Sequence, residues 1–167
     1  TPGTQRYRDY APSWSPDSSR LVIASEQKGH SNLYVIDVES GGRTPLSDLE
    51  VDQLTPQWSP DSATIAYVQN DGLEFHIWRV PSGGGSPVRV SDRPGTNGGF
   101  DRKDSSPHGH LAWSPDSRLI TFTHSSPTRA SDVWVANATG GRSSPLTNSM
   151  PHTLGEQWRM SPKSCAG

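Results

Sequence analysis

Apolar and polar residues alternate in short stretches along most of this chain. In three of these stretches an apolar residue stands seven and nine positions after a tryptophan: Leu21 and Ile23, Ile65 and Tyr67, and Ile120 and Phe122. Alternation with a period of two residues is typical of a strand that buries one face. A run with an aromatic residue in its second place follows each stretch, at 33–36, 77–80 and 133–136. The pattern predicts an all-β chain.

These strands belong to a repeated unit. The pentapeptide Trp-Ser-Pro-Asp-Ser begins at Trp14, Trp58 and Trp113, and a degenerate copy begins at Trp158. The successive tryptophans are 44, 55 and 45 residues apart. A repeat of about 45 residues that holds four short strands and their turns is one blade of a β-propeller. The sequence therefore predicts a partial β-propeller: three four-stranded antiparallel blades plus one strand of a fourth.

The repeat also divides the chain into successive parts. A glycine turn and a short proline-containing segment close each complete unit, and proline cannot donate to a β-ladder, so we expect this last strand at the outer edge of its blade. In chain order we predict a lead-in (1–10), blade 1 (11–50), blade 2 (51–91), an inserted loop (92–110), blade 3 (111–150), and the first strand of a fourth blade with a tail (151–167).

The repeated tryptophans and aspartates have structural roles in this interpretation. We expect the tryptophans to pack in the core, since each occupies a repeated apolar position. Proline presets the backbone for the second place of a tight turn, and aspartate bonds the backbone beside it. We therefore interpret Asp17, Asp61 and Asp116 as turn residues. A catalytic role is the alternative, but aspartates at blade spacing would lie too far apart to act together.

The motifs W-S-P-D-x-x-x-I-x-F, then I-Y-V-x-D, G-G and P-L-T resemble the TolB-like (WD-like) β-propeller repeat over residues 11–162. The same repeat is found in the propellers of prolyl-oligopeptidase-type serine peptidases and of tricorn-type proteases. The resemblance implies a propeller fold, and it favours a bacterial periplasmic or exported setting. One departure matters: the family usually has glycine after Pro-Asp, where this chain has Ser18, Ser62 and Ser117. If the turn keeps its positive φ, each serine carries strain of about 1 kcal/mol or more.

Composition narrows the function classes. Fifteen basic and seventeen acidic side chains give a net charge of -2, which lacks the basic excess expected of a nucleic-acid-binding protein. Glycine (16) and proline (15) are too frequent for a helical bundle. No apolar run approaches the length of a membrane-spanning helix. Cys165 is the only cysteine, so neither an internal disulfide nor a cysteine-based zinc site is expected.

The inserted loop holds the candidates for partner contact. Loops on a rigid scaffold often carry function. This loop has one aromatic residue that we expect to be exposed, two basic residues and two histidines: Phe100, Arg102, Lys103, His108 and His110. A loop without a role is the alternative. The His-x-His pair could bind zinc with a third ligand, but no spacing here is diagnostic, and we expect neither a metal nor a cofactor.

No serine stands in a G-x-S-x-G nucleophile elbow. We therefore expect this chain not to be an enzyme but a non-catalytic interaction scaffold for a protein or peptide. The alternative is the substrate-gating propeller segment of a prolyl-oligopeptidase-type serine peptidase whose catalytic domain lies outside this chain. Three blades do not close a propeller. The chain is expected to be completed by the remainder of a longer protein or by a second copy in a six-bladed ring, with an open arc as the third alternative.

Overall fold

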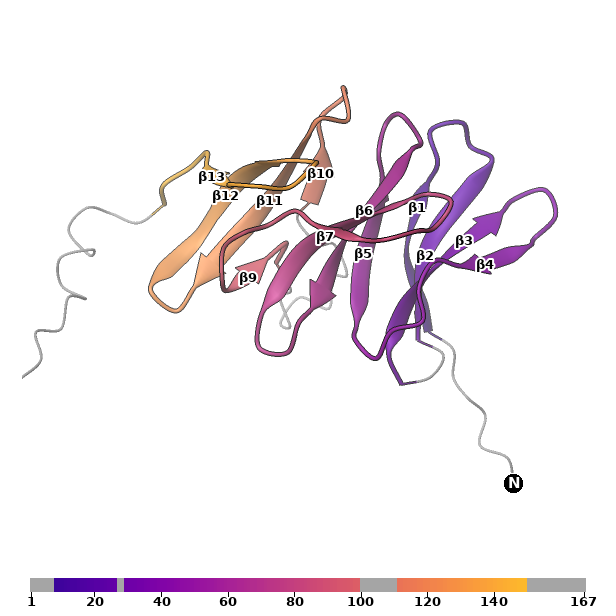
Figure 1. Cartoon of the computed structure of the whole chain (residues 1–167), viewed down its shortest axis with the longest axis horizontal. Coiled ribbons are helices and arrows are strands. Elements are labelled where there is room, and N and C mark those ends of the chain that lie inside the picture. The colour runs from indigo at the N-terminus through magenta and orange to yellow at the C-terminus, as the bar shows by residue number, and fades with distance from the viewer. Residues whose placement is uncertain (1–7, 27–28, 100–110, 150–167) are drawn as a thin grey trace, which may run out of the picture.

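The computed structural model describes residues 8–26, 29–99 and 111–149, and in these ranges it contains thirteen β-strands and no helix. None of these residues forms the kind of long apolar helix that crossing a membrane requires. The first sheet has four antiparallel strands in the order β1 (Arg8–Trp14), β2 (Arg20–Glu26), β3 (Ser31–Asp37) and β4 (Arg43–Pro45). We call this sheet blade 1 (Figure 1).

Two further sets of four antiparallel strands follow it. Blade 2 consists of β5 (Gln53–Trp58), β6 (Thr64–Asn70), β7 (Phe75–Pro81) and β8 (Val88–Arg89). Blade 3 consists of β10 (Leu111–Trp113), β11 (Leu119–Ser126), β12 (Arg129–Asn137) and β13 (Ser144–Pro145). Figure 1 shows the three blades side by side in chain order, which confirms the predicted partial all-β propeller.

A short extra strand, β9 (Thr96–Asn97), joins blades 2 and 3. It pairs with β11, where Asn97 faces His124, and it touches the start of β7, where Thr96 faces Phe75. In blade 2 the inner strand β5 begins with the corresponding pair, Gln53 facing Gln69. By this correspondence β9 is the start of the inner strand of blade 3. The predicted loop 92–110 therefore includes an ordered piece of strand, and its residues 100–110 lie outside the described part.

The inner strands share a bulge. Between Tyr10 and Ser13 the register of β1 against β2 shifts, and Ala11 in this interval has a φ of 52°. The register of β5 shifts in the same way at Thr55, which has a φ of 48°. Both bulged residues precede a proline. A bulge inserts an unpaired residue and bends the strand, so the repeat includes this local distortion as well as its turns.

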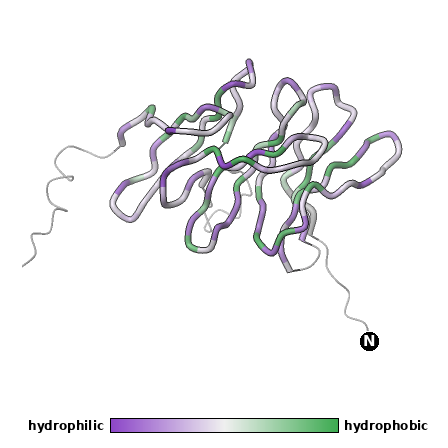
Figure 2. Tube along the Cα trace, viewed as in Figure 1, coloured by the Kyte–Doolittle hydropathy of each residue, from purple (hydrophilic) through white to green (hydrophobic). Residues whose placement is uncertain are grey.

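The core consists of two apolar layers, each between neighbouring blades. Side chains from β2 and β3 face side chains from β5, β6 and β7: Val22, Ala24, Leu33 and Val35 against Trp58, Ile65, Tyr67 and Val80. A second layer packs Ala66, Val68, Ile77 and Val90 against Leu111, Ile120, Phe122, Trp134, Ala136 and Ala138. Hydrophobic residues recur along the strands of all three blades (Figure 2). Burying a Val, Leu or Ile side chain contributes about 1.5–3 kcal/mol, so these layers hold the blades together.

The tryptophans at the ends of the inner strands do not share one environment. Trp58 is 6% exposed because it packs against blade 1. Trp113 is partly buried against the layer between blades 2 and 3, and its Nε1 donates to Gln57 O at 3.2 Å. Trp14 is 55% exposed. The expectation of core packing is wrong for Trp14, because Trp58 and Trp113 pack against the preceding blade and no described blade precedes blade 1.

Candidate functional site

The Ser-Pro-Asp-Ser segments form the same hairpin turn in every blade. In blade 1 the N–H of Ser18 donates to Ser15 O at 2.8 Å, and the corresponding distances are 2.9 Å in blades 2 and 3. The last serine has a positive φ each time: 60° at Ser18, 62° at Ser62 and 60° at Ser117. This confirms the left-handed backbone inferred from the usual glycine. The N–H of Ser15 donates to Arg20 O at 2.8 Å, so four residues, 16–19, connect the two strands, and a connection of this length is commonly built around such a turn.

The turn aspartates are held by their neighbours. In blade 1 Asp17 Oδ1 accepts the hydroxyl of Ser15 at 2.6 Å and the N–H of Ser19 at 3.1 Å. The hydroxyl of Ser15 is the main reason that the pKa of Asp17 is lowered to about 2. The pKa values of Asp61 and Asp116 are lowered by the hydroxyls of Ser59 and Ser114 in the same way. Each of these carboxylates accepts hydrogen bonds within its turn as an anion, which stabilises the turn.

The five predicted partner-contact residues belong to the segment 100–110. Phe100, Arg102, Lys103, His108 and His110 lie outside the described residues, and so does Trp158. Their role stays a prediction. Among the residues that are described, no three His, Cys, Asp or Glu side chains are grouped as a metal site would require.

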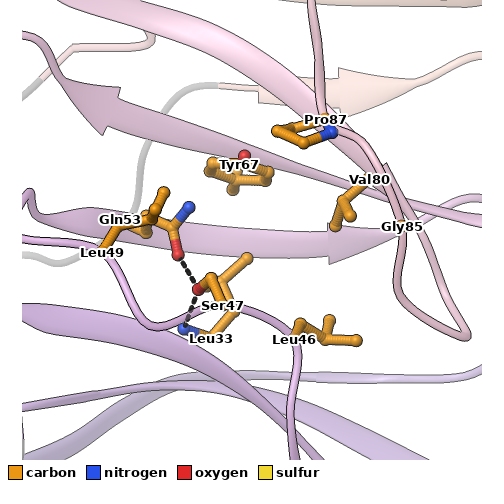
Figure 3. Close-up of a pocket in the computed structure, with 9 residues that line it drawn as sticks. All are labelled: Leu33, Leu46, Ser47, Leu49, Gln53, Tyr67, Val80, Gly85 and Pro87. Atoms are coloured by element: carbon orange, nitrogen blue, oxygen red, sulfur yellow. Dashed lines mark hydrogen bonds between the residues drawn. The ribbon is translucent and has the colours of Figure 1, made fainter.

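A cleft between blades 1 and 2 is the feature that sequence reasoning missed. It has a volume of about 160 Å³. Its walls are aliphatic, and its polar lining residues are Ser47, Gln53 and Tyr67 (Figure 3). The wall residues come from both blades and from the segments that follow their third and fourth strands: Leu33, Leu46, Leu49, Val80 and Pro87. These residues are dispersed over more than fifty positions, so no local pattern could have shown them together.

The polar end of the cleft is internally hydrogen-bonded. The hydroxyl of Ser47 lies 3.2 Å from Asn32 Oδ1 and contacts Gln53 Oε1. Gln53 Nε2 donates to Gln69 Oε1 at 3.4 Å. Burial raises the pKa of Tyr67 above its usual range, so its hydroxyl stays protonated. The cleft thus combines apolar walls with a neutral, largely satisfied polar end.

The junction between blades 2 and 3 uses histidines where the first junction uses amides. His76 on β7 corresponds to Asn32, and His124 on β11 corresponds to Gln69. His124 Nδ1 lies 3.0 Å from Asn97 Oδ1, and Asn97 Nδ2 donates to Phe75 O at 2.9 Å. Asn97 in β9 therefore connects the two blades through side-chain hydrogen bonds.

Charged residues surround His124. Its ring packs edge-on against Trp134, with 4.9 Å between the ring centroids. Burial lowers the pKa of His124, and Arg129 and Arg93 lower it further against the opposing effect of Asp92 and Asp132. The buried imidazole therefore stays neutral at pH values at which an ordinary histidine already binds a proton.

The rim of this second junction is closed by a hydrogen-bonded clamp. The backbone N–H of Ser143, just before β13, donates to Asp92 Oδ1 at 3.0 Å, and the Ser143 hydroxyl donates to the same oxygen. Ser143 is 2% exposed and Val90 beside it is 1% exposed. The first junction carries the cleft at the corresponding place.

Comparison with known proteins identifies the repeat. The family model described as TolB beta propeller domain matches residues 3–162. The Tol-Pal system protein TolB of Bordetella pertussis is 33% identical over 114 residues, which cover 68% of this chain and 24% of that protein. Dipeptidyl peptidase 4 of Trichophyton tonsurans is 36% identical over 103 residues, which cover 57% of this chain and 12% of that protein.

The structural comparison agrees with the fold. The crystal structure of Porphyromonas gingivalis dipeptidyl peptidase 4 matches with a TM-score of 0.67 at 16% identity, over 87% of this chain and 19% of that one. The chain thus spans a quarter or less of the length of these three proteins. The match of the family model over nearly the whole sequence is the decisive finding. This chain belongs to the TolB β-propeller domain family.

Proposed function

We propose that this chain is a non-catalytic β-propeller module that acts as a protein-interaction scaffold. The observation that carries the proposal is the cleft between blades 1 and 2, where aliphatic side chains from two sheets surround a cavity of about 160 Å³ beside a neutral polar end. Apolar clefts with a few convergent polar groups are the usual form of a binding site. The missing nucleophile elbow argues against serine-peptidase chemistry in this chain.

The partner in this proposal is a protein or peptide, with no nucleic acid, membrane insertion or cofactor involved. The remaining blades are supplied by the rest of a longer chain or by a second copy that completes a six-bladed ring. The exposed Trp14 supports this part of the proposal, because its counterpart in blade 2 is buried by a neighbouring blade. The bacterial periplasmic or exported setting implied by the family resemblance belongs to the same proposal.

A second function is favoured by the relatives. Similarity to dipeptidyl peptidase 4 supports a substrate-gating propeller segment of a prolyl-oligopeptidase-type peptidase whose catalytic domain lies elsewhere. Sequencing the full reading frame of the gene distinguishes the scaffold function from the peptidase function. Continuation into an α/β-hydrolase segment with a serine elbow would favour the peptidase, whereas an end after six or seven blades would favour the scaffold.

Selection of binding peptides tests the scaffold directly. The immobilised chain is used to select from a phage-displayed library of random peptides, and the enriched peptides are resynthesised for affinity measurement. We expect a shared sequence pattern and dissociation constants of about 1–100 μM, since one small cleft supplies few anchoring contacts. Failure to enrich any peptide with a shared pattern would contradict the scaffold function.

Hydrolysis assays test the non-catalytic part. The purified chain should turn over neither chromogenic Gly-Pro and Ala-Pro peptides nor simple esters. Ser91 Oγ does lie 3.3 Å from His76 Nδ1, but Ser91 is 1% exposed and its hydroxyl oxygen accepts the N–H of Ile77, so a substrate does not reach it. Turnover that survives purification and is lost on one Ser or His substitution would overturn the non-catalytic assignment. A contaminating peptidase would not respond to such a substitution.

A further inference from the structure

The two junctions between described blades use equivalent positions of the repeat, but their contacts differ at the outer rim. Aligned by the repeat, Leu46 corresponds to Val90, Asp48 to Asp92, and Pro87 to Ser143. At the second junction Ser143 clamps Asp92 through both its N–H and its hydroxyl. Val90 is fully buried there. The clamp therefore draws the fourth strand of blade 2 and the glycine turn of blade 3 together.

The corresponding clamp cannot form at the first junction. Proline has neither a backbone N–H nor a hydroxyl, so Pro87 lacks both donors that Ser143 uses. Pro87 is exposed and Leu46 is only partly buried, in contrast to their counterparts. The cleft lies between these two residues (Figure 3). The difference between Pro87 and Ser143 thus removes the clamp at the junction that is open.

The cleft has the size and chemistry for one aromatic ring. Its volume of about 160 Å³ is close to the roughly 150 Å³ of an apolar protein cavity that takes up benzene. None of the described residues that line it is charged, so a charged group would lose its hydration without gaining a counter-ion from them. Ser47 and Gln53 already bond each other at the polar end, so the incoming group needs no polar tip. Tyr67 offers a ring against which a second ring can pack edge-on.

We propose that the cleft between blades 1 and 2 binds one phenylalanine side chain of a partner peptide, and that Pro87 keeps the cleft open. The proposal rests on the scaffold function and names the chemistry of its partner. Leu49, which is 42% exposed at the mouth, covers the ring from solvent once it is bound. Alanine in place of the phenylalanine leaves the walls uncovered and loses most of the affinity.

The test uses N-acetyl-L-phenylalaninamide as the probe and the whole chain as the protein. Titration followed by NMR should give shifts confined to residues around Leu46, Leu49 and Pro87, with a dissociation constant of about 1 mM for a ligand of this size. N-acetyl-L-alaninamide should give no such shifts. Shifts scattered over the surface, or equal shifts with both probes, would overturn the proposal.

Substitutions make the test specific. Pro87→Ser restores the donors of the clamp and should weaken binding of the phenylalanine probe at least tenfold. Leu46→Trp should have the same effect by filling the cleft from its other wall. Pro145→Ser, which also removes a rim proline but lies on β13 away from the cleft, should leave binding unchanged. Full binding in both Pro87→Ser and Leu46→Trp would contradict the assignment.

The selected peptides separate this inference from the scaffold function. Peptides that carry a required phenylalanine and bind Pro87→Ser at least tenfold more weakly support both. If peptides are enriched but bind Pro87→Ser as tightly as the unchanged chain, the scaffold function stands and the assignment of the cleft fails. If the probe binds in the cleft but no peptide is enriched, the scaffold function fails and the ring site stands.

Discussion

At the scale of single residues, the serines with positive φ show where the repeat stores strain. Ser18, Ser62 and Ser117 adopt a backbone conformation that glycine adopts without cost. The hydroxyls of Ser62 and Ser117 differ in their hydrogen bonds. Ser117 Oγ accepts the N–H of Asp61 from the neighbouring blade at 3.0 Å, whereas within the residues described the hydroxyl of Ser62 has no hydrogen-bond partner.

This difference predicts opposite results for one substitution at two equivalent sites. Ser62→Gly should raise the free energy of unfolding by up to about 1 kcal/mol, because it relieves backbone strain and removes no bond. Ser117→Gly should give little or no gain, because it also removes the acceptor for Asp61, a bond of about 1 kcal/mol. Urea unfolding followed by tryptophan fluorescence measures both. A loss of stability in Ser62→Gly would mean that the turn depends on the serine.

At the scale of elements, β9 decides how blades 2 and 3 are joined. It is only two residues long, yet Asn97 bonds the backbone of β7 and the ring of His124 on β11. His124 is 4% exposed, so a proton added there would create a buried charge in the junction. The first junction avoids this because Gln69, which does not titrate, stands at the corresponding position.

The pH dependence of stability follows from this arrangement. The pKa of folded His124 lies below the ordinary value of 6.5, so the unfolded chain binds the proton more readily than the folded chain. The contribution of the neutral ring to the free energy of unfolding is therefore complete well above pH 6.5, and it is lost as the pH falls below that value. His124→Gln should reduce the loss of stability between pH 7.5 and pH 5, measured by urea midpoints.

Gln69→His supplies the matched control for this prediction. It places a histidine at the corresponding position of blade 2, beside Gln53 and Asp71. An increased acid sensitivity in this variant would show that a histidine at this position of a blade is sufficient to lower the stability of the chain in acid. An unchanged pH profile in His124→Gln would contradict the role given to the junction.

At the scale of the whole molecule, the two faces of each blade differ, so the blades stack in one direction only. The face that carries the tryptophan packs against the preceding blade, and the opposite face, with smaller residues such as Val22 and Ala24, receives the following one. Blade 1 presents its tryptophan face with Trp14 exposed, and blade 3 presents Val133 and Val135 on its opposite face. These two faces are of complementary kinds, as the two internal junctions show.

The chain should therefore associate head to tail in solution. Sedimentation equilibrium should give a mass above that of the 18.1 kDa monomer, and Trp14→Glu should weaken association at least tenfold by placing a charge in the contact. Leu73→Glu is the control, because Leu73 is 99% exposed but lies in the hairpin between β6 and β7. A monodisperse monomer, or equal effects of the two substitutions, would rule out this mode of assembly.

Much of the architecture could be predicted because it depends on patterns among residues that are close in the sequence. Each blade forms within about 45 residues, and its strands, glycine turns and Ser-Pro-Asp-Ser hairpins depend on neighbours a few positions away. The positive φ of Ser62 could be inferred from the residue type that usually stands there. The start of the inner strand at Thr96 and Asn97 could not, because two polar residues carry no alternation and form a strand only through β11 and β7.

The sequence by itself determined the repeat, the strand order within each blade and the conformation of the turns, since these depend on contacts close in the chain. Only the tertiary structure decided what lies between the blades. Pro87 and Ser143 occupy the same place in their repeats, and their difference matters only because the fold brings Ser143 to Asp92, fifty-one positions away. Trp14 and Trp58 likewise share a motif but not an environment, because burial depends on the blade that packs alongside. The cleft and the exposed face are properties of packing between distant segments, which no local pattern contains.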